Sequence, residues 1–536
     1  MHLGFCRHYA IIRRSQFARS QHTMQLTSGQ QEPTYENAIR FLVKHQHNKG
    51  YTVEETRRKV ALNGMKEFLQ RVDISDKDLD SMKVIHVTGT KGKGSTCAFV
   101  ESILRQHGVR TGFLSSPHLL ENRERIRING KPISRSLFAK YFWNVYTSLK
   151  NNNHLYKMDI PPYFHIFTLL SFYVFKHENV DAAIIEASIG GENDQTNVVK
   201  HPVVCGVSSI GIDHIDHLGD NIASVAWHKS GIFRENVPAF TVQHQPLEAM
   251  KLLQQRADGI GASLHVAPEL KEYSTNDKKT VDIKLGLAGN FQKLNASLAL
   301  QLSKYWLNQY GFSKHTEINK PFTLDSLCRK GLSSCHWTGR AQVVKFNSAT
   351  FYLDGAHTAE SIQFAADWFK QESEKERKSL DRPCMKMLAI NVSTSKIIYH
   401  LLSILYECGF DKAIFTPAII GSNSPSGFID ETINKRSLND PFESVIRNRS
   451  EWSRLLSEHN LKATNDNCLL YPCAADAIRW MSQKREAELY SRCGMWTSDK
   501  PKQDQELEGK HVQVLVTGSL SLLGIYLRLL CPDVND

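Results

Sequence analysis

The feature that most constrains the fold is a glycine-rich segment from Gly89 to Thr96, with the sequence Gly-Thr-Lys-Gly-Lys-Gly-Ser-Thr. The apolar run Val84–Val87 precedes it, and apolar residues at helical spacing, from Ala98 to Leu104, follow it. This order predicts a buried strand, a loop and an amphipathic helix. Backbone N–H groups of such a loop converge on phosphate oxygens, and the helix N-terminus adds the positive end of its dipole. The segment therefore predicts a phosphate-binding loop.

The side chains of this loop have the chemistry that a nucleoside triphosphate requires. Lys93 is placed to bridge the β- and γ-phosphates, and a hydroxyl from Ser95 or Thr96 to approach Mg²⁺. The loop is not a strict Walker A motif, because Gly94 separates the lysine from the hydroxyl residues. A plain glycine-rich turn is the alternative interpretation. The ATP-binding residues predicted here are Gly89, Thr90, Lys91, Gly92, Lys93, Gly94, Ser95 and Thr96.

Apolar runs alternate with helical stretches along most of the chain, which predicts an α/β fold with parallel sheets and crossover helices. We expect an N-terminal phosphate-loop ATPase domain at residues 24–337 and a smaller, Rossmann-like α/β domain at residues 338–536. The predicted strands of the first domain are Val84–Val87, Gly112–Leu114, Ala182–Ile185 and Val203–Val207. Those of the second are Phe351–Leu353, Met387–Ile390, Lys412–Phe415 and Val512–Val516, with a helix at Leu401–Cys408.

The remaining segments also carry structural signals. The spacing of apolar residues in Tyr35–Leu79 predicts helices before the first strand. The longest apolar stretch, Ile166–Phe175, is too short to span a bilayer and predicts a buried helix, so we expect no transmembrane segment. Two polar stretches, Gly421–Glu451 and Ser482–Gly509, predict surface loops.

Length and composition limit the class of protein. A chain of 536 residues exceeds the usual size of one hydrophobic core, which favours two domains. Residues 1–23 supply +4 of the net charge of +11, and the excess of +7 in the rest of the chain favours an anionic substrate such as a nucleotide. There is no dense Lys/Arg tract with interleaved aromatic residues, so nucleic acid is not an expected partner. The 11 cysteines form no CxxC pair, which is typical of reduced thiols in an intracellular protein.

The first 23 residues contain four arginines and no acidic residue, and they end directly before Met24. This composition is typical of a mitochondrial transit peptide. A disordered or untranslated basic leader is the alternative interpretation. An internal start at Met24 would give a cytosolic form. We therefore expect the protein in mitochondria, in the matrix or at the inner membrane, and also in the cytoplasm.

Two further residues lie where open α/β sheets bind ligands, beyond the carboxyl ends of the strands. Glu186 follows the apolar run Ala182–Ile185, as an acid that holds Mg²⁺ beside a phosphate loop would. A solvated acid at a strand end is the alternative for Glu186. His214 follows another predicted strand, in a position where a lone histidine is more often structural than a ligand.

Motifs along the chain occur at His86–Thr96, Ser115–Leu119, Arg123–Gly130, Pro202–Ser209, Gly211–His214, Leu353–Thr358 and Val516–Leu520. Together they resemble the folylpolyglutamate synthases, which are relatives of the Mur ligases. The resemblance implies an N-terminal ATPase domain, a C-terminal Rossmann-like domain and a site in the cleft between them. It also implies ATP-dependent ligation of L-glutamate to the glutamyl carboxylate of a reduced folate through an acyl phosphate. We expect reduced folates and L-glutamate as partners, Mg²⁺ as cofactor, and a monomer.

The resemblance assigns metal ligands in the first domain. Ser115, Glu186 and His214 correspond to magnesium ligands, with Ser95 as a further candidate. Lys229 matches a lysine that is carbamylated in the wider family, and carbamylation would turn a cation into a carboxylate able to hold a second Mg²⁺. A plain surface lysine is the alternative for Lys229.

The resemblance also assigns residues around the nucleotide. Gln292 and Asn295 match the adenine-side motif of the family. In the second domain, Arg340, Asp354 and His357 would reach ATP or the acyl phosphate, and a linker charge is the alternative for Arg340. The residues that the resemblance marks as catalytic are Lys93, Lys229 and His357.

Three functions are compatible with these motifs. The first is the ligase. The second is a nucleotide-dependent switch or transporter ATPase, which would have no need for the Asp354–His357 motif at a domain junction. The third is a diverged paralogue that binds nucleotide or folate without efficient ligation. Departures from the family pattern support the diverged paralogue, and they are Ser188, His228, Ser230, Phe291 and Lys396–Ile397. If the protein is a ligase, the departure at Lys396 predicts a raised KM for glutamate.

Overall fold

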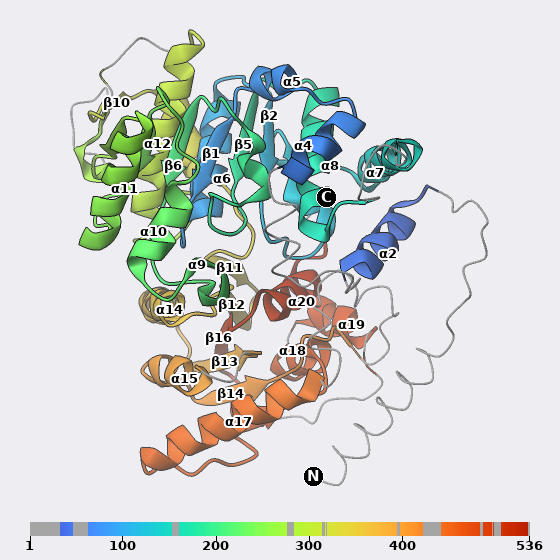
Figure 1. The fold of residues 1–536 in the computed structure, drawn as a ribbon. Helices are drawn as coiled ribbons and strands as arrows, with labels where there is room; N and C mark the ends of the chain where they lie inside the picture. Colours follow the sequence, from blue (N-terminus) through green and yellow to red (C-terminus); the bar gives the residue numbers. More distant parts are fainter. Residues whose placement is uncertain are drawn as a thin grey trace. The chain divides into compact units, whose positions relative to one another are not determined.

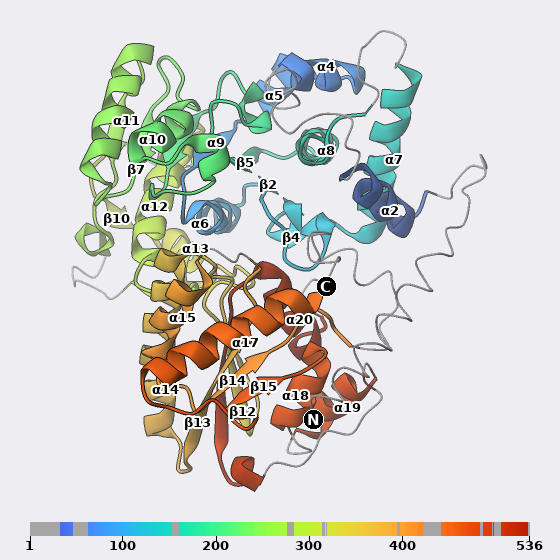
Figure 2. The same cartoon turned by 60° about the horizontal axis from the view of Figure 1, so that its bottom comes forward.

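The computed structural model describes residues 33–46, 63–152, 160–275, 283–312, 317, 319–393, 397–421, 441–482, 486–495, 497 and 505–533. The chain divides into two compact units between Trp337 and Thr338. Each unit has its own largely parallel sheet (Figures 1 and 2). Separate clusters of buried hydrophobic side chains pack against each sheet. The predicted leader, Met24 and Lys396 lie outside the described residues.

The first unit is built on an eight-stranded sheet in the order β4-β3-β2-β5-β1-β6-β7-β8. Strand β1 (Ile85–Thr88) pairs in parallel with β5 (Ala182–Glu186) on one side and β6 (Val204–Val207) on the other. The parallel part continues to β2 (Thr111–Leu114) beyond β5, and to β7 (Ala239–Thr241) and β8 (Leu264–Val266) beyond β6. An antiparallel edge is formed by β3 (Ile126–Ile128) and β4 (Lys131–Pro132), and β9 (Ser274–Thr275) pairs separately with β10 (Thr323–Leu324).

Side chains of the central strands alternate between two cores. Phe113 and Ile184 face a core shared with α6, α12 and α13, whereas Leu114 and Ile185 face a core shared with α2, α4, α5, α7 and α8. Strands buried on both faces need apolar residues at every position, which explains why their runs are continuously apolar. The helices of the two cores are α6 (Lys93–Gln106), α12 (Gln292–Gln309), α13 (Ser326–Ser333), α2 (Tyr35–Gln46), α4 (Asn63–Arg71), α5 (Asp76–Ser81), α7 (Arg135–Asn151) and α8 (Tyr163–His177).

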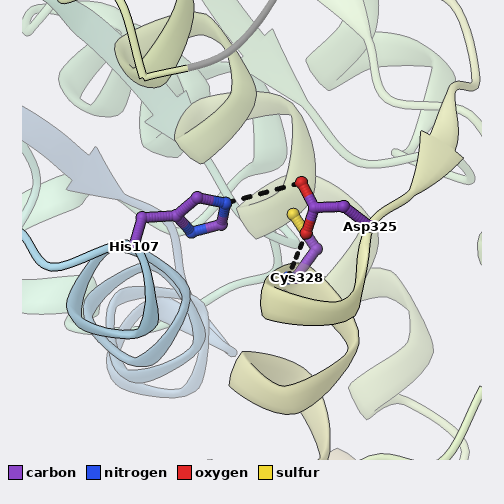
Figure 3. Close-up of side chains that lie close together, drawn as sticks. All are labelled: His107, Asp325 and Cys328. Atoms are coloured by element: carbon purple, nitrogen blue, oxygen red, sulfur yellow. Dashed lines mark hydrogen bonds and ion pairs between the residues drawn. The ribbon is translucent and has the colours of Figure 1, made fainter.

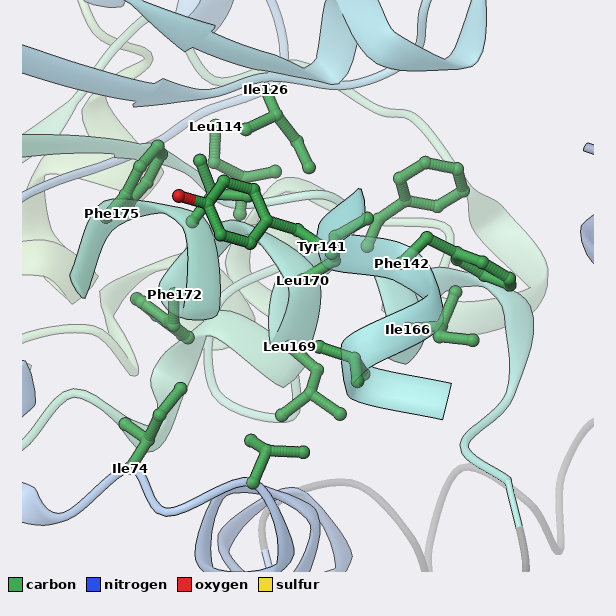
Figure 4. Close-up of a cluster of buried hydrophobic side chains, with 14 of the residues drawn as sticks. Ile74, Leu114, Ile126, Tyr141, Phe142, Ile166, Leu169, Leu170, Phe172 and Phe175 are labelled. Carbon is green, nitrogen blue, oxygen red and sulfur yellow. The ribbon is translucent and has the colours of Figure 1, made fainter. Parts of the chain in front are cut away.

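Figure 4 shows the second of these cores, in which α7 and α8 contribute large aromatic and aliphatic side chains. Phe142, Phe172 and Phe175 are fully buried there, and burial of each such side chain contributes about 1.5–3 kcal/mol. The predicted helix at Ile166–Phe175 is thus confirmed as part of α8. A third core lies between β6 and β7 and three helices, which are α9 (Ile215–Leu218), α10 (Ile222–Ser230) and α11 (Leu247–Ile260). The unit also contains three short 3₁₀ turns, η1 (Asn122–Arg125), η3 (Gln195–Val198) and η4 (Leu270–Glu272).

The second unit has a six-stranded sheet in the order β11-β12-β16-β13-β14-β15. The edge strand β11 (Gln342–Lys345) is antiparallel to β12 (Ala349–Leu353), and all the other pairs are parallel. The remaining strands are β13 (Cys384–Ile390), β14 (Lys412–Phe415), β15 (Cys468–Leu470) and β16 (His511–Thr517). The helices are α14 (Ala359–Ser379), α15 (Ile398–Tyr406) and α17 (Pro441–Glu458), which share one core, and α18 (Ala474–Ser482), α19 (Ala487–Gly494) and α20 (Leu520–Leu530), with the turn η6 (Gln505–Leu507).

The predicted α/β fold class is confirmed, and each predicted strand is present with its ends moved by at most a few residues. The prediction of surface loops was wrong in two places, because α17 begins at Pro441 and α19 at Ala487. Both helices are polar on one face only, and Val445, Trp452 and Cys493 are buried on the other. Among the described residues, no helix is long and apolar enough to cross a membrane.

Candidate functional site

The glycine-rich loop connects β1 to α6 at the carboxyl end of the sheet. Gly92, directly before α6, has a φ of +89°, and Gly89 has a φ of +142°, both in the region that favours glycine. A Cβ atom at Gly89 would lie 1.9 Å from Ser208 Oγ, and one at Gly92 would lie 2.1 Å from Asn295 Oδ1. Both glycines are therefore required by the backbone conformation and by the close approach of neighbouring side chains.

The segment that follows β6 supports the loop. The N–H groups of Thr90 and Lys91 donate to the carbonyl oxygen of Ser209 at 2.8 and 3.1 Å. Thr90 Oγ1 donates to the carbonyl oxygen of Gly211 at 2.8 Å. These two N–H groups are thus used within the protein. The N–H groups left for a phosphate are those in the first turn of α6, which have no carbonyl partner within the helix.

We expect Gly92→Ala to weaken ATP binding at least about tenfold, and Gly108→Ala to leave it unchanged. Both glycines have positive φ values, +89° and +83°, so alanine costs about 1–2 kcal/mol of backbone strain at either position. Only the Cβ at Gly92 meets another atom, since nothing lies within 4 Å of one at Gly108. Calorimetric titration of the two folded variants with ATP measures the difference. Equal weakening in both would contradict a role for the contact with Asn295.

Two lysines donate to the same carbonyl oxygen of the loop. Lys93 Nζ lies 2.9 Å from Gly89 O, and Lys229 Nζ, from the end of α10, lies 2.7 Å from it. Lys229 is only 2% exposed, so the alternative of a plain surface lysine does not hold. Burial, followed by the charge of Lys93, lowers the pKa of Lys229 well below its usual value. The Gly89 carbonyl offsets part of the positive charge at these two amines, and a bound anion would offset more.

Ser115 and Glu186 lie on neighbouring strand ends beside the loop. Ser115 follows β2 and Glu186 ends β5, and these two strands pair in parallel. Both residues are buried, and the N–H group of Ser116 donates to Glu186 Oε2 at 3.2 Å. A Cβ at Gly94 would lie 3.3 Å from the same oxygen, so the carboxylate faces the first turn of α6. Glu186 is therefore a buried acid at the phosphate loop, and not the solvated acid of the alternative interpretation.

His214 follows β6, which pairs with β1 on the side opposite to β5. Its Nε2 lies 3.9 Å from Asp213 Oδ2, and Lys91 Nζ lies 3.9 Å from the same oxygen. Burial lowers the pKa of His214, although the charge of Asp213 opposes this, so the imidazole is neutral at neutral pH. The structure thus places Ser115 beside Glu186, whereas His214 lies with Asp213 and Lys91.

The amide side chains at the start of α12 contact the phosphate loop. Gln292 Nε2 donates to Ser95 Oγ at 3.3 Å, and Asn295 Nδ2 donates to Gln292 Oε1 at 2.9 Å. Both side chains are buried, and Asn295 also contacts Gly92. These two residues therefore support the loop and the first turn of α6, a role that the sequence did not indicate.

In the second unit, three predicted residues gather at the carboxyl end of β12. Asp354 accepts hydrogen bonds from two backbone N–H groups, at 2.8 and 2.9 Å. Burial raises the pKa of Asp354, and the charge of Arg340 opposes the increase. A Cβ at Gly355 would lie 2.9 Å from Arg340 Nη1, and His357 Nδ1 lies 2.9 Å from the Gly355 carbonyl oxygen. Arg340 thus belongs to a local cluster and is more than a linker charge.

Two positions of the first unit that depart from the family pattern, Ser188 and Ser230, make local hydrogen bonds. The N–H group of Ser188 donates to Asp194 Oδ2 at 3.0 Å, and Ser230 Oγ donates to the Trp227 carbonyl oxygen at 2.9 Å. Asp194 is fully buried and fixes the segment after β5, but sequence reasoning did not single it out. The sequence pattern that could have identified Asp194 is Asp-x-Thr, which is typical of a turn. In the structure, Asp194 Oδ1 accepts a hydrogen bond from the N–H group of Thr196 at 3.0 Å.

Known proteins resemble this chain over most of its length. The chain is 37% identical, over 554 residues, to a human protein named Folylpolyglutamate synthase, mitochondrial, and the match covers 94% of each chain. It is 39% identical over 461 residues to the folylpolyglutamate synthase of Candida albicans, covering 79% of this chain and 87% of the other. No protein-family model matches the chain.

Solved structures share the fold. The folylpolyglutamate synthase of Mycobacterium tuberculosis, complexed with ADP and AMPPCP, has a TM-score of 0.64 at 21% identity, covering 92% of this chain and 99% of the other. The apo form of L. casei FPGS has a TM-score of 0.62 at 20% identity, with the same coverage. At such identities the likeness establishes the fold alone. The family follows from the sequence identity over 94% of the chain: the chain belongs to the folylpolyglutamate synthase family.

Proposed function

We propose that this protein is an ATP-dependent ligase that adds L-glutamate to the glutamyl carboxylate of tetrahydrofolates. The observation that carries the proposal is the 37% identity, over 94% of the chain, to a relative named as a folylpolyglutamate synthase. The phosphate loop supports ATP as co-substrate, because Lys93 and Lys229 both meet at its Gly89 carbonyl. No observation favours a nucleotide switch or a paralogue without ligase activity.

The residues beside the loop fit a magnesium ion. Mg²⁺ prefers oxygen ligands and keeps several waters, so one or two carboxylate or hydroxyl groups suffice. Glu186 supplies a buried carboxylate that faces the first turn of α6, and the hydroxyls of Ser95 and Ser115 are the nearby candidates. When bound, Mg²⁺ would neutralise charge on the phosphates. His214 stays a proposed ligand on the strength of the family resemblance.

Formation of an amide from a carboxylate requires activation, because hydroxide is a poor leaving group. In the proposed first step, a folate carboxylate oxygen attacks the γ-phosphorus of ATP, and the bond to the β–γ bridging oxygen breaks. The products are an acyl phosphate and ADP. Lys93 would leave the Gly89 carbonyl to contact the β- and γ-phosphates, where charge develops during the transfer.

In the proposed second step, the amine of glutamate attacks the acyl carbon, loses a proton and displaces inorganic phosphate. Water must be excluded at this stage, because it would hydrolyse the acyl phosphate. The family resemblance gives His357, Arg340 and Asp354 roles toward ATP and the acyl phosphate. These roles stay predictions, as does the monomeric state, which a light-scattering mass near 60.9 kDa would support.

One assay distinguishes the three functions. Purified protein is incubated with ATP, Mg²⁺, tetrahydrofolate and labelled glutamate, and the folate products and ADP are quantified together. A ligase incorporates label into a folate one glutamate longer and forms one ADP for each glutamate added. ADP formed without incorporation would indicate a switch or transporter ATPase. Binding of ATP and folate without either product would indicate the diverged paralogue.

We propose that the protein occurs in mitochondria and, from a start at Met24, in the cytoplasm. A reporter fused to residues 1–23 is expected to enter mitochondria, because the segment carries four arginines and no acid. In the matched control, glutamine replaces the four arginines Arg7, Arg13, Arg14 and Arg19. This control reporter is expected to stay in the cytosol. Fluorescence microscopy and cell fractionation measure both. An unaltered leader that left the reporter cytosolic would refute the proposal.

A further inference from the structure

Three side chains with different donor atoms converge at the end of α6 far from the phosphate loop. His107 directly follows α6, Asp325 precedes α13, and Cys328 lies in the first turn of α13. One nitrogen, one oxygen and one sulfur atom of these residues all lie within 4.8 Å of one another (Figure 3). In the described part of the chain, no other group of three or more His, Cys, Asp or Glu residues has its donor atoms this close together.

One hydrogen bond of the His107 ring fixes its tautomer. Its Nδ1 lies 2.8 Å from the carbonyl oxygen of Ile103, and a carbonyl can only accept, so Nδ1 carries the proton. In the neutral ring, Nε2 then presents a lone pair. The side chain is 4% exposed, its Nε2 is buried without a hydrogen-bond partner, and this atom lies 3.5 Å from Asp325 Oδ2. A metal ion bound between these two electron-pair donors would satisfy both of them.

Asp325 has an oxygen to spare for such an ion. Its Oδ1 accepts from the N–H group of Cys328 at 2.7 Å and so caps α13, while Oδ2 faces His107 (Figure 3). The sulfur of Cys328 adds a third donor, and its residue is 3% exposed. A set of one imidazole, one carboxylate and one thiolate is typical of zinc sites and unlike the all-oxygen sets of Mg²⁺.

We propose that His107, Asp325 and Cys328 bind one zinc-class divalent ion, with water as the fourth ligand. Tetrahedral zinc with bonds of about 2.0–2.3 Å separates its ligand atoms by roughly 3.5 Å. The distance between His107 Nε2 and Asp325 Oδ2 already has this value, at 3.5 Å. The widest separation, up to 4.8 Å, requires an approach of about 1 Å, which rotation of side chains can supply.

The surroundings resemble those of a built metal site. Histidine ligands usually donate their second N–H group to a carbonyl or carboxylate, and Ile103 O has this role here. The two helices are also held in place, because Ser102 Oγ donates to the Gly331 carbonyl oxygen at 2.8 Å. A Cβ at Gly331 would lie 2.7 Å from Ile103 Cα, so α6 and α13 are in close contact. The ligands thus project from rigid elements.

The proposed site is distinct from the magnesium site of the reaction. Helix α6 has 14 residues, so its two ends are about 20 Å apart, with Lys93 at one end and His107 just beyond the other. An ion here would join the end of the phosphate-loop helix to α13. The inference does not depend on the proposed ligase activity.

Cobalt is the probe for this site. The full-length protein, freed of metal by dialysis against a chelator, is titrated with Co²⁺ and its absorption spectrum is recorded. We expect about one equivalent to give a thiolate-to-cobalt charge-transfer band together with intense tetrahedral bands. Co²⁺ bound only by oxygen ligands at the phosphate loop gives neither. Zn²⁺ is expected to abolish the spectrum and to raise the melting temperature.

Matched variants assign the signal to residues. Cys328→Ser is expected to remove the charge-transfer band, and His107→Gln to weaken Co²⁺ binding at least about tenfold. Cys335→Ser is the control, because Cys335 is an equally buried thiol just after α13 and is not a member of the cluster. Circular dichroism checks that each variant is folded. If Cys328→Ser does not fold, the Co²⁺ affinity of His107→Gln tests the proposal. Absence of the band from wild-type protein, or its survival in Cys328→Ser, would overturn the proposal and leave a contact between His107 and Asp325 without a metal ion.

Discussion

Lys93→Ala is expected to lower ATP-dependent ligation by at least about 10²–10³-fold while leaving the fold intact. Lys93 is the first residue of α6, and its Nζ lies at the Gly89 carbonyl, within the loop that would hold the phosphates. Alanine removes the one side-chain cation that projects from the start of this helix. The loss should appear in kcat, because charge develops on the transferring phosphoryl group in the transition state.

The matched control is Lys66→Ala, which removes an exposed lysine from α4 in the same unit. It should retain wild-type activity. The measurement is initial-rate incorporation of labelled glutamate, together with the melting temperature of each variant. A folded Lys93→Ala protein with wild-type turnover would end the assignment of Lys93 to the reaction.

The second large effect is expected at Lys229. Lys229→Ala should lower ligation at least about a hundredfold, because the residue is buried and its Nζ donates to Gly89 O at 2.7 Å. If Lys229 is carbamylated, short carboxylic acids such as acetate should restore part of the activity. Carbamylation requires a neutral amine, and burial beside Lys93 lowers the pKa of Lys229 and so favours that form. Acidification protonates the amine, so the carbamylated fraction of Lys229 should decrease as the pH is lowered.

Lys229→Arg separates the two chemical roles. Arginine keeps a cation but cannot form the carbamate. A carbamylated Lys229 therefore predicts that Lys229→Arg is inactive and that acetate rescues only the alanine variant. If arginine restores activity and acetate has no effect on Lys229→Ala, the residue acts as a cation and the carbamylation hypothesis is wrong. Melting temperatures of both variants control for the cavity that alanine leaves.

The sequence predicted the elements whose signals are local. The strand, loop and helix around Gly89 were predictable because the apolar run, the glycines and the helical spacing follow one another directly. Glu186 was also predictable, as an acid placed directly after an apolar run that forms a central parallel strand. The sequence did not predict the antiparallel strand β3, which lies between β2 and the edge strand β4, because Ile126 and Ile128 are flanked by charged residues and the strand has only three residues.

Contacts that join distant segments were not predictable in the same way. The support of the loop by the Ser209 carbonyl depends on a backbone atom, which leaves no trace in the residue types. The burial of Lys229 depends on the packing of α10 beside the loop. The local sequence, a lysine followed by a serine and a glycine, is as compatible with an exposed side chain as with a buried one. The composition of helix α17 predicts a loop because its charged face dominates, although Trp452 is buried on the other face.

The partners of the phosphate loop are separated from it by long stretches of chain, and this has a consequence for synthesis on the ribosome. Thr90 and Gly211 lie 121 positions apart, Gly89 and Lys229 140, and Ser95 and Gln292 197. At about 5–20 residues per second, α12 is made roughly 10–40 s after the loop. Until then the nascent chain has the glycine-rich segment without Gln292 and Asn295, the amide side chains that contact it from α12. Stabilisation of the complete phosphate loop by ATP is therefore expected only late in the translation of this unit.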